Sequence, residues 1–142
     1  MHVCLATYCS PNTRKIAVKL CELGVSLDFI LYNPRQATYI QEIMEDWGGA
    51  RIHPLKEDKS PHPWIGFLKT AQCMRSLLKQ IKPDIVHTRF LYPHSVHAML
   101  SGYRPHLAEA VGCDLLVMPG EKWIWNTLIK KSLKSADHVL TV

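Results

Sequence analysis

The chain has 142 residues, 47% of them hydrophobic, which is enough for one domain with its own apolar core. The formal net charge of +5 arises from 17 Lys and Arg against 12 Asp and Glu. This modest excess favours phosphate-bearing ligands or an anionic membrane surface. A nucleic-acid partner is not expected, because the sequence shows neither a dense basic stripe with interleaved aromatics nor a known nucleic-acid-binding module.

The cysteines of the chain are Cys4, Cys9, Cys21, Cys73 and Cys113. Their odd number and their apolar surroundings indicate free thiols in a reducing compartment. Their spacing predicts neither a metal site nor a disulfide framework. The apolar run after Met1 is too short for a signal peptide or a membrane-spanning helix, so we expect a cytoplasmic protein.

The first two dozen residues predict a strand followed by a helix. Residues 2–8 form a compact apolar run that is typical of a strand buried on both faces of a parallel sheet. Ser10, Pro11 and Asn12 supply the chemistry of a helix start, and apolar residues at helical spacing continue until Gly24 ends the helix.

A second strand is predicted over residues 25–31, directly after the glycine. An i, i+3, i+4, i+7 apolar stripe then predicts a helix over 37–47, with a glycine pair at 48–49 as its terminator. Residues 51–55 are expected to form a short third strand.

A polar, proline-bearing segment at 56–63 is expected to be a loop. Residues 64–81 place their apolar side chains on one face and predict a long helix that Pro83 closes. Residues 84–87 are expected to start a fourth strand, with His87 and Arg89 at its carboxyl end.

The last third of the chain predicts shorter elements in the same alternation. In order, these are a helix over 93–100, a turn at 101–102, an extended segment over 105–111, a loop at 112–114, a helix over 121–135 and a strand over 137–142.

Strands that alternate with helices across short connections predict an α/β fold, a Rossmann-like three-layer sandwich around a mainly parallel sheet. Residues 1–142 are expected to form a single domain of this kind. In such sheets the ligand crevice lies at the carboxyl ends of the strands. The loops after Tyr8, His87 and Val111 are therefore the places to look for a site.

Several motifs resemble the N-terminal domain of glycosyltransferase family 4. Residues 82–87 read Lys-Pro-Asp-Ile-Val-His, which is similar to the family's K-P-D-[IV]-[VI]-H segment. Residues 92–94 and the Gly-Cys-Asp of 112–114 resemble its proline strand and G-x-D loop. Residues 135–142 are similar to the A-D-x-[VI]-[IL]-x-[VT] strand near the end of that domain.

The resemblance implies one half of a GT-B fold, in which two Rossmann-like domains face each other across a cleft. This chain would be the acceptor-side half of a retaining glycosyltransferase of the hexosyltransferase type, with a glycan or lipid-linked acceptor. The nucleotide-sugar donor would bind a C-terminal domain that this chain lacks. We therefore expect a fragment that is inactive alone and that needs neither a cofactor nor a metal ion.

Eight residues of the predicted carboxyl-end loops are candidates for acceptor binding. They are Ser10, Asn12, His87, Arg89, Tyr92, His94, Gly112 and Asp114. Most of them also have a purely structural interpretation. Ser10 and Asn12 suit helix caps, and Asp114 suits a turn or a helix cap. His87 suits a hydrogen bond that caps the strand, and Tyr92 and His94 suit packing against the adjacent helix.

The chain also departs from the family pattern. Cys9-Ser10-Pro11-Asn12 stands where many members have a glycine pair, and Val111 stands where many have a histidine that contacts the donor sugar. These departures keep open a second hypothesis, a stand-alone Rossmann-like or flavodoxin-like module that binds a ligand or partner without catalysis. A dinucleotide-dependent oxidoreductase is rejected, because no G-x-G-x-x-G follows the first strand.

The predicted final helix has a basic outer side. Lys130, Lys131 and Lys134 lie outside its apolar stripe, together with Trp123. Such a helix suits peripheral contact with the inner face of the membrane. The alternative is an ordinary solvated surface helix.

Overall fold

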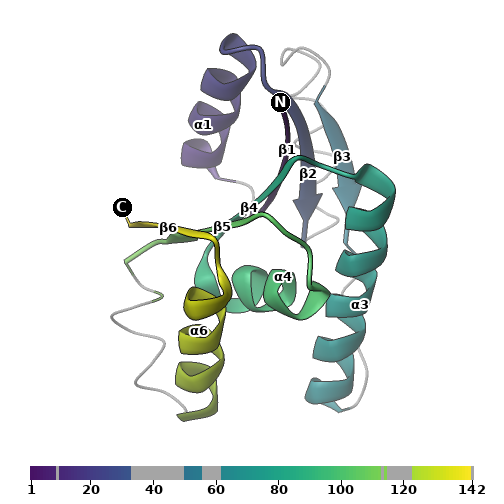
Figure 1. Cartoon of the computed structure of the whole chain (residues 1–142), viewed down its shortest axis with the longest axis vertical. Coiled ribbons are helices and arrows are strands. Elements are labelled where there is room, and N and C mark those ends of the chain that lie inside the picture. The colour runs from purple at the N-terminus through teal and green to yellow at the C-terminus, as the bar shows by residue number, and fades with distance from the viewer. Residues whose placement is uncertain (9, 33–49, 56–61, 113, 115–122, 142) are drawn as a thin grey trace.

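The computed structural model describes residues 1–8, 10–32, 50–55, 62–112, 114 and 123–141. Its centre is a six-stranded parallel sheet in the order β3-β2-β1-β4-β5-β6 (Figure 1). The predicted Rossmann-like α/β fold with a parallel sheet is therefore confirmed. The strands are β1 (His2–Thr7), β2 (Ser26–Leu31), β3 (Arg51–Pro54), β4 (Ile85–Arg89), β5 (His106–Ala110) and β6 (His138–Thr141).

Helices cover the sheet on both faces, which gives the three layers. Helix α1 (Pro11–Glu22) packs Ala17 against Val3 and Leu5 of β1. The alternate side chains of the same strand, Cys4 and Ala6, point to the other face and join the second apolar cluster. Burial on both faces explains why β1 is an unbroken apolar run rather than an alternating one.

The second face is covered by the later helices. These are α3 (Pro63–Ile81), α4 (Val96–Ser101) and α6 (Trp123–Ser135). A kinked segment, η1 (Leu91–Ser95), leads into α4, and its Tyr92 has extended backbone angles. Met74 of α3 and Ala98 of α4 pack on the centre of the sheet. Ile129 of α6 packs over β5.

The change of face follows from the strand order. From β1 the chain moves outward to β2 and β3, and it then returns to lay β4, β5 and β6 on the other side of β1. Because parallel crossovers are right-handed, reversing the direction also moves the helices to the opposite face. The reversal lies between β1 and β4, and in open α/β sheets ligands bind at the carboxyl ends of the strands beside such a point.

The helix boundaries show the expected local chemistry. Ser10 caps α1, because its hydroxyl accepts a hydrogen bond from the Thr13 amide at 3.1 Å. Gly24 follows α1 with a φ of 74°, a left-handed conformation that glycine adopts without strain. Lys82 ends α3 with a φ of 51°, so the helix stops in a left-handed residue just before Pro83.

Most predicted elements are confirmed within one to a few residues. Strand β4 ends at Arg89, so His87 and Arg89 lie at its carboxyl end as expected. The predicted helix over 37–47, the loop over 56–61 and the start of the last helix at 121–122 lie outside the described residues.

Candidate functional site

An ionic cluster occupies the α1 face of the sheet beside the switch point. We call Thr13, His87, Arg89 and Glu109 the switch-point cluster. His87 and Arg89 are two residues apart in β4, so both side chains point to the same face. The register of β4 and β5 places Glu109 directly beside Arg89. All four residues are buried.

One carboxylate holds the cluster together. Arg89 Nε donates to Glu109 Oε1 at 2.9 Å, and His87 Nε2 donates to Oε2 of the same carboxylate at 3.0 Å. Arg89 Nη1 lies 3.4 Å from the Thr13 hydroxyl and so ties the sheet to the first turn of α1. Burial raises the pKa of Glu109, but the His87 hydrogen bond and the Arg89 charge outweigh it and leave that pKa below its ordinary value.

Glu109 was not among the predicted site residues, although it is the strongest partner that two of them have. A buried arginine was expected to need an anionic partner, and the structure supplies that partner from within the chain. A signal was present in the sequence, since Glu109 is the one carboxylate in the apolar segment 105–111. What the sequence did not reveal is the register that places it beside Arg89.

A second group of side chains lies on the opposite face, at the carboxyl ends of β1, β2 and β4. His94 is fully buried, and its ring lies 4.4 Å from the Tyr8 ring and 4.1 Å from the Tyr32 ring, centroid to centroid. Its Nδ1 donates to the Arg89 carbonyl at 2.6 Å. Burial lowers the pKa of His94 to about 3, more than the carbonyl hydrogen bond raises it, so the imidazole is neutral at neutral pH.

The neutral tautomer gives His94 an acceptor that the protein does not use. With the proton on Nδ1, the lone pair of Nε2 faces the buried interior, and this atom has no hydrogen-bond partner among the described residues. Buried polar atoms without a partner are uncommon and costly. Because Nε2 is buried, the donor that could satisfy it is a buried water rather than a ligand in solution.

Asp114 ties together the loops that follow β4 and β5. Its Oδ2 accepts hydrogen bonds from the Leu91 amide at 3.0 Å and from the Val111 amide at 3.2 Å. Burial raises the pKa of Asp114, and the two backbone hydrogen bonds oppose that shift. The residue fits its structural interpretation, because both bonds go to backbone.

The remaining predicted residues are spread around the same edge. Ser10 acts as the cap of α1, and Asn12 is exposed on its first turn. Tyr92 is half-buried between Phe67 and Trp125, with ring centroids 5.9 and 4.5 Å away. No described atom lies within 4 Å of where a side chain at Gly112 would begin. The structure thus brings His87 and Arg89 together on one face and His94 and Asp114 around the loop after β4, while Asn12 stays apart.

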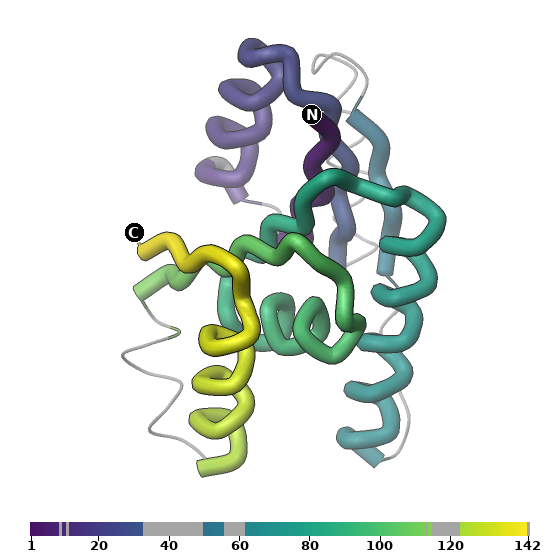
Figure 2. The backbone as a smooth tube through the Cα atoms, viewed as in Figure 1, coloured from purple at the N-terminus to yellow at the C-terminus, as the bar shows by residue number. Residues whose placement is uncertain are grey.

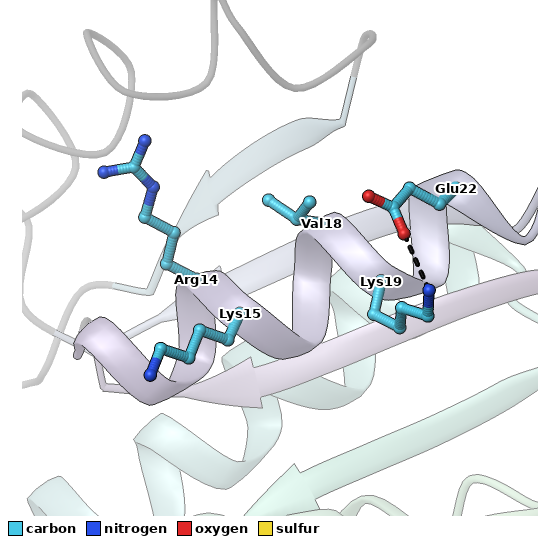
Figure 3. Close-up of a pocket in the computed structure, with 5 residues that line it drawn as sticks. All are labelled: Arg14, Lys15, Val18, Lys19 and Glu22. Atoms are coloured by element: carbon cyan, nitrogen blue, oxygen red, sulfur yellow. Dashed lines mark hydrogen bonds and ion pairs between the residues drawn. The ribbon is translucent and has the colours of Figure 1, made fainter.

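A surface hollow of about 540 Å³ lies elsewhere, on the outer side of α1 (Figure 3). It is lined by Arg14, Lys15, Val18, Lys19 and Glu22. Lys19 and Glu22 pair across it at 2.9 Å. None of the eight predicted residues lines it, so it is not the predicted site.

No group of three or more His, Cys, Asp or Glu side chains is arranged to hold a metal ion in the part of the chain that the structure describes. None of the described helices is long and apolar enough to cross a membrane.

The family follows from a direct sequence comparison. The model of the family described as "Glycosyl transferase 4-like" matches residues 8–142, which is nearly the whole chain. The chain therefore belongs to this family and is a glycosyltransferase-type domain. The resemblance seen at residues 82–87 is confirmed. No sequence among the curated proteins matches the chain.

Solved structures with the same fold are distant in sequence. UDP-GlcNAc 2-epimerase from Neisseria meningitidis, bound to UDP-GlcNAc, is 13% identical with a TM-score of 0.67, and the match covers 96% of this chain and 39% of that one. MurG of Acinetobacter baumannii is 15% identical with a TM-score of 0.63, covering 99% and 41%. UGT73P12 of Glycyrrhiza uralensis, complexed with glycyrrhetinic acid 3-O-monoglucuronide, is 14% identical with a TM-score of 0.65, covering 99% and 43%. The chain thus spans about two fifths of the length of these structures and has the fold of one half of a GT-B protein.

Proposed function

We propose that this domain forms the acceptor-side wall of a retaining, hexosyltransferase-type glycosyltransferase site. A second Rossmann-like domain would present the nucleotide sugar, and this one would hold a glycan or lipid-linked acceptor. The observation that carries the proposal is the family match over residues 8–142 together with a polar site at the carboxyl edge of the sheet. Sugar transfer needs donor and acceptor held together where water is excluded, which suits a cleft with two walls.

In the proposed reaction, the bond from the anomeric carbon to the nucleotide phosphate breaks and a bond to an acceptor hydroxyl oxygen forms. The proton of that hydroxyl leaves with the departing phosphate. His94 packs beneath the loop after β4 and so helps to shape the acceptor position, while its low pKa keeps the buried imidazole neutral. Asp114 fixes the loops on either side of this position.

The switch-point cluster has a positioning role in this proposal. The guanidinium of Arg89 is held in an ion pair with Glu109. It therefore positions neighbouring groups and does not neutralise the charge of a ligand. The Arg89 carbonyl in turn fixes the tautomer of His94. The two faces of the sheet are linked through one residue of β4.

The remaining parts of the proposal concern partners and location. The isolated domain is inactive, because the donor binds the other wall. We place the enzyme in the cytoplasm at the inner face of the membrane, in carbohydrate biosynthesis. Peripheral contact is made through Trp123, Lys130, Lys131 and Lys134.

Calorimetric titration of the 142-residue chain tests the acceptor role. We expect heat of binding with acceptor oligosaccharides and none with nucleotide sugars. Tight binding of a mononucleotide by this chain would instead support the second hypothesis, a Rossmann-like binding module. That alternative is favoured by the Ser10-Pro11-Asn12 start of α1, which lacks the glycine pair, and by Val111.

A further inference from the structure

Four aromatic rings meet where α3, α6 and η1 come together. We call Trp64 and Phe67 of α3, Tyr92 of η1 and Trp125 of α6 the ring platform. The Trp125 ring is at its centre, with ring centroids 4.5 Å from Tyr92, 5.3 Å from Trp64 and 6.2 Å from Phe67. The Phe67 and Tyr92 rings are nearly parallel, with 8° between their planes. Three segments that are far apart in the sequence thus present one aromatic surface.

The ring platform reaches solvent at the end of the domain that carries the candidate site. Trp64 is 44% exposed, and the other three rings are each partly exposed. Figures 1 and 2 show the amino ends of α3 and α6 at the same extremity of the molecule, past the carboxyl ends of the strands. Tyr92 belongs to the loop that Asp114 anchors. The platform is therefore continuous with the edge at which we propose that the acceptor binds.

Hydrogen-bonding groups at the rim of the platform are not used by the protein. Neither the Tyr92 hydroxyl nor the Trp125 indole N–H bonds to a described residue, and neither is among the fully buried polar atoms. Burial and the nearby Tyr8 raise the pKa of Tyr92, so its phenol stays protonated and can both donate and accept. Tyr and Trp side chains in packed positions ordinarily use these polar groups. The two groups are therefore available to a ligand.

A saccharide ring has the chemistry that such a surface fits. The C–H groups on one face of a pyranose form a flat apolar patch that packs on an aromatic ring, and the hydroxyl groups around it bond to N–H and O–H groups. An acyl chain would contact the rings but leave the polar groups of Tyr92 and Trp125 unused. Neither α3 nor α6 contains an Asp or Glu, so the surface offers no counter-charge to an amine-bearing ligand.

We propose that the ring platform is the subsite for a pyranose ring of the acceptor, uncharged or acidic, stacked on Trp64 and Trp125 with one of its hydroxyl groups bonded to the Tyr92 hydroxyl. The inference rests on the proposed function and deepens it, because the acceptor is then recognised through a sugar ring. Tyr92 is the one member of the platform that the sequence indicated as acceptor-binding. The structure adds two residues of α3 and one of α6 to it.

Calorimetric titration of the 142-residue chain with cellohexaose tests the subsite. This probe is a β-1,4-linked glucose oligomer whose rings expose flat C–H faces. Trp64→Leu should weaken binding about tenfold, the loss of one stacking contact. Ile65→Ala is the matched control, because Ile65 is 45% exposed on the same turn of α3 but lies about 100° further round the helix. It should leave the dissociation constant unchanged.

Tyr92→Phe separates binding from packing. Phenylalanine keeps a ring against Phe67 and Trp125 and removes only the hydroxyl. Binding of cellohexaose should weaken about fivefold, the effect of one hydrogen bond, while the urea midpoint stays unchanged. Unchanged binding by both Trp64→Leu and Tyr92→Phe overturns the subsite, as does absence of binding by the unmodified chain. The acceptor role itself fails on a different result, tight binding of a nucleotide by the chain.

Two further probes test other occupants of the platform. The glucosamine hexamer has the same linkage as cellohexaose but carries amines, so it should bind several-fold more weakly because no carboxylate is present on α3 or α6. Equal or tighter binding of this hexamer overturns the proposal. Decanoate supplies a single acyl chain. If decanoate binds more tightly than cellohexaose and Trp64→Leu abolishes that binding, the platform holds an apolar chain and the proposal is wrong.

Discussion

Arg89 and Glu109 are direct neighbours across the pairing of β4 and β5, and their side chains form a buried ion pair at 2.9 Å. Each is at most 6% exposed. Removing one member of such a pair leaves a charge in a place where water cannot solvate it.

Glu109→Gln should lower the free energy of unfolding by about 3–5 kcal/mol, because Arg89 would remain buried without its counter-ion. Urea unfolding followed by circular dichroism measures the change. Glu22→Gln is the control, since Glu22 makes an ion pair with Lys19 that is largely exposed, and it should cost under about 1 kcal/mol. Equal effects of the two substitutions would contradict the assigned role of Glu109.

Protonation of Asp28 should destabilise the folded chain in acid. Its carboxylate accepts hydrogen bonds from His53, His2 and Arg51, which outweigh the effect of burial and hold the pKa of Asp28 below its ordinary value of 3.8. A folded pKa below the unfolded one means that the stabilisation is complete above about pH 3.8 and is lost as the pH falls through the folded pKa. Urea midpoints measured from pH 6 downward should therefore fall less steeply for Asp28→Asn than for the unmodified chain. If the urea midpoints of the two proteins fall in parallel with pH, Asp28 does not contribute to the loss of stability in acid.

Lys82→Gly should stabilise the chain by about 1 kcal/mol. Lys82 ends α3 with a φ of 51°, a conformation that costs a side-chain-bearing residue energy and costs glycine little. Lys79→Gly provides the opposite control, because glycine inside the same helix should destabilise it by about 1 kcal/mol. Thermal unfolding of both variants decides the matter, and a loss of stability in both would show that Lys82 is not strained.

His94→Phe tests the proposed positioning role of His94. Phenylalanine keeps a ring between Tyr8 and Tyr32 but removes the Nδ1 donor to the Arg89 carbonyl and the Nε2 acceptor. With the proposed second domain present, kcat/KM should fall about 10-fold, the loss expected for one buried hydrogen bond. The folded fraction is measured in parallel by urea unfolding. A fall in activity that only matches the loss of folded protein would assign His94 to packing.

The architecture was predictable because the central strands are buried on both faces. Residues 2–8 form a compact apolar run, and residues 25–31 are apolar apart from Ser26 and Asp28. Between clear helix signals, that pattern favours a parallel α/β sheet. Strand β4 carries two polar residues, His87 and Arg89, at its carboxyl end, and Glu109 of the neighbouring strand satisfies both of them. The sequence did not indicate this partner.

The site was predictable only as a region. The loops after β1, β4 and β5 do meet at one edge, as strand direction requires. The partners of each side chain depend on the register between paired strands and on the side of the sheet that the side chain faces. Neither can be predicted from the neighbouring residues in the sequence. His87 and Arg89 face α1 while His94 lies among rings on the other side, so residues close in sequence entered two different environments.

The two backbone hydrogen bonds that Asp114 accepts have a mechanical consequence. A single oxygen, Oδ2, anchors Leu91 at the start of one loop and Val111 at the start of another. A shift of either anchor is transmitted to the other through that shared atom. The segments that begin at Leu91 and Val111, some twenty positions apart in the sequence, are thus mechanically coupled. A substitution that displaces one of them should also displace the other.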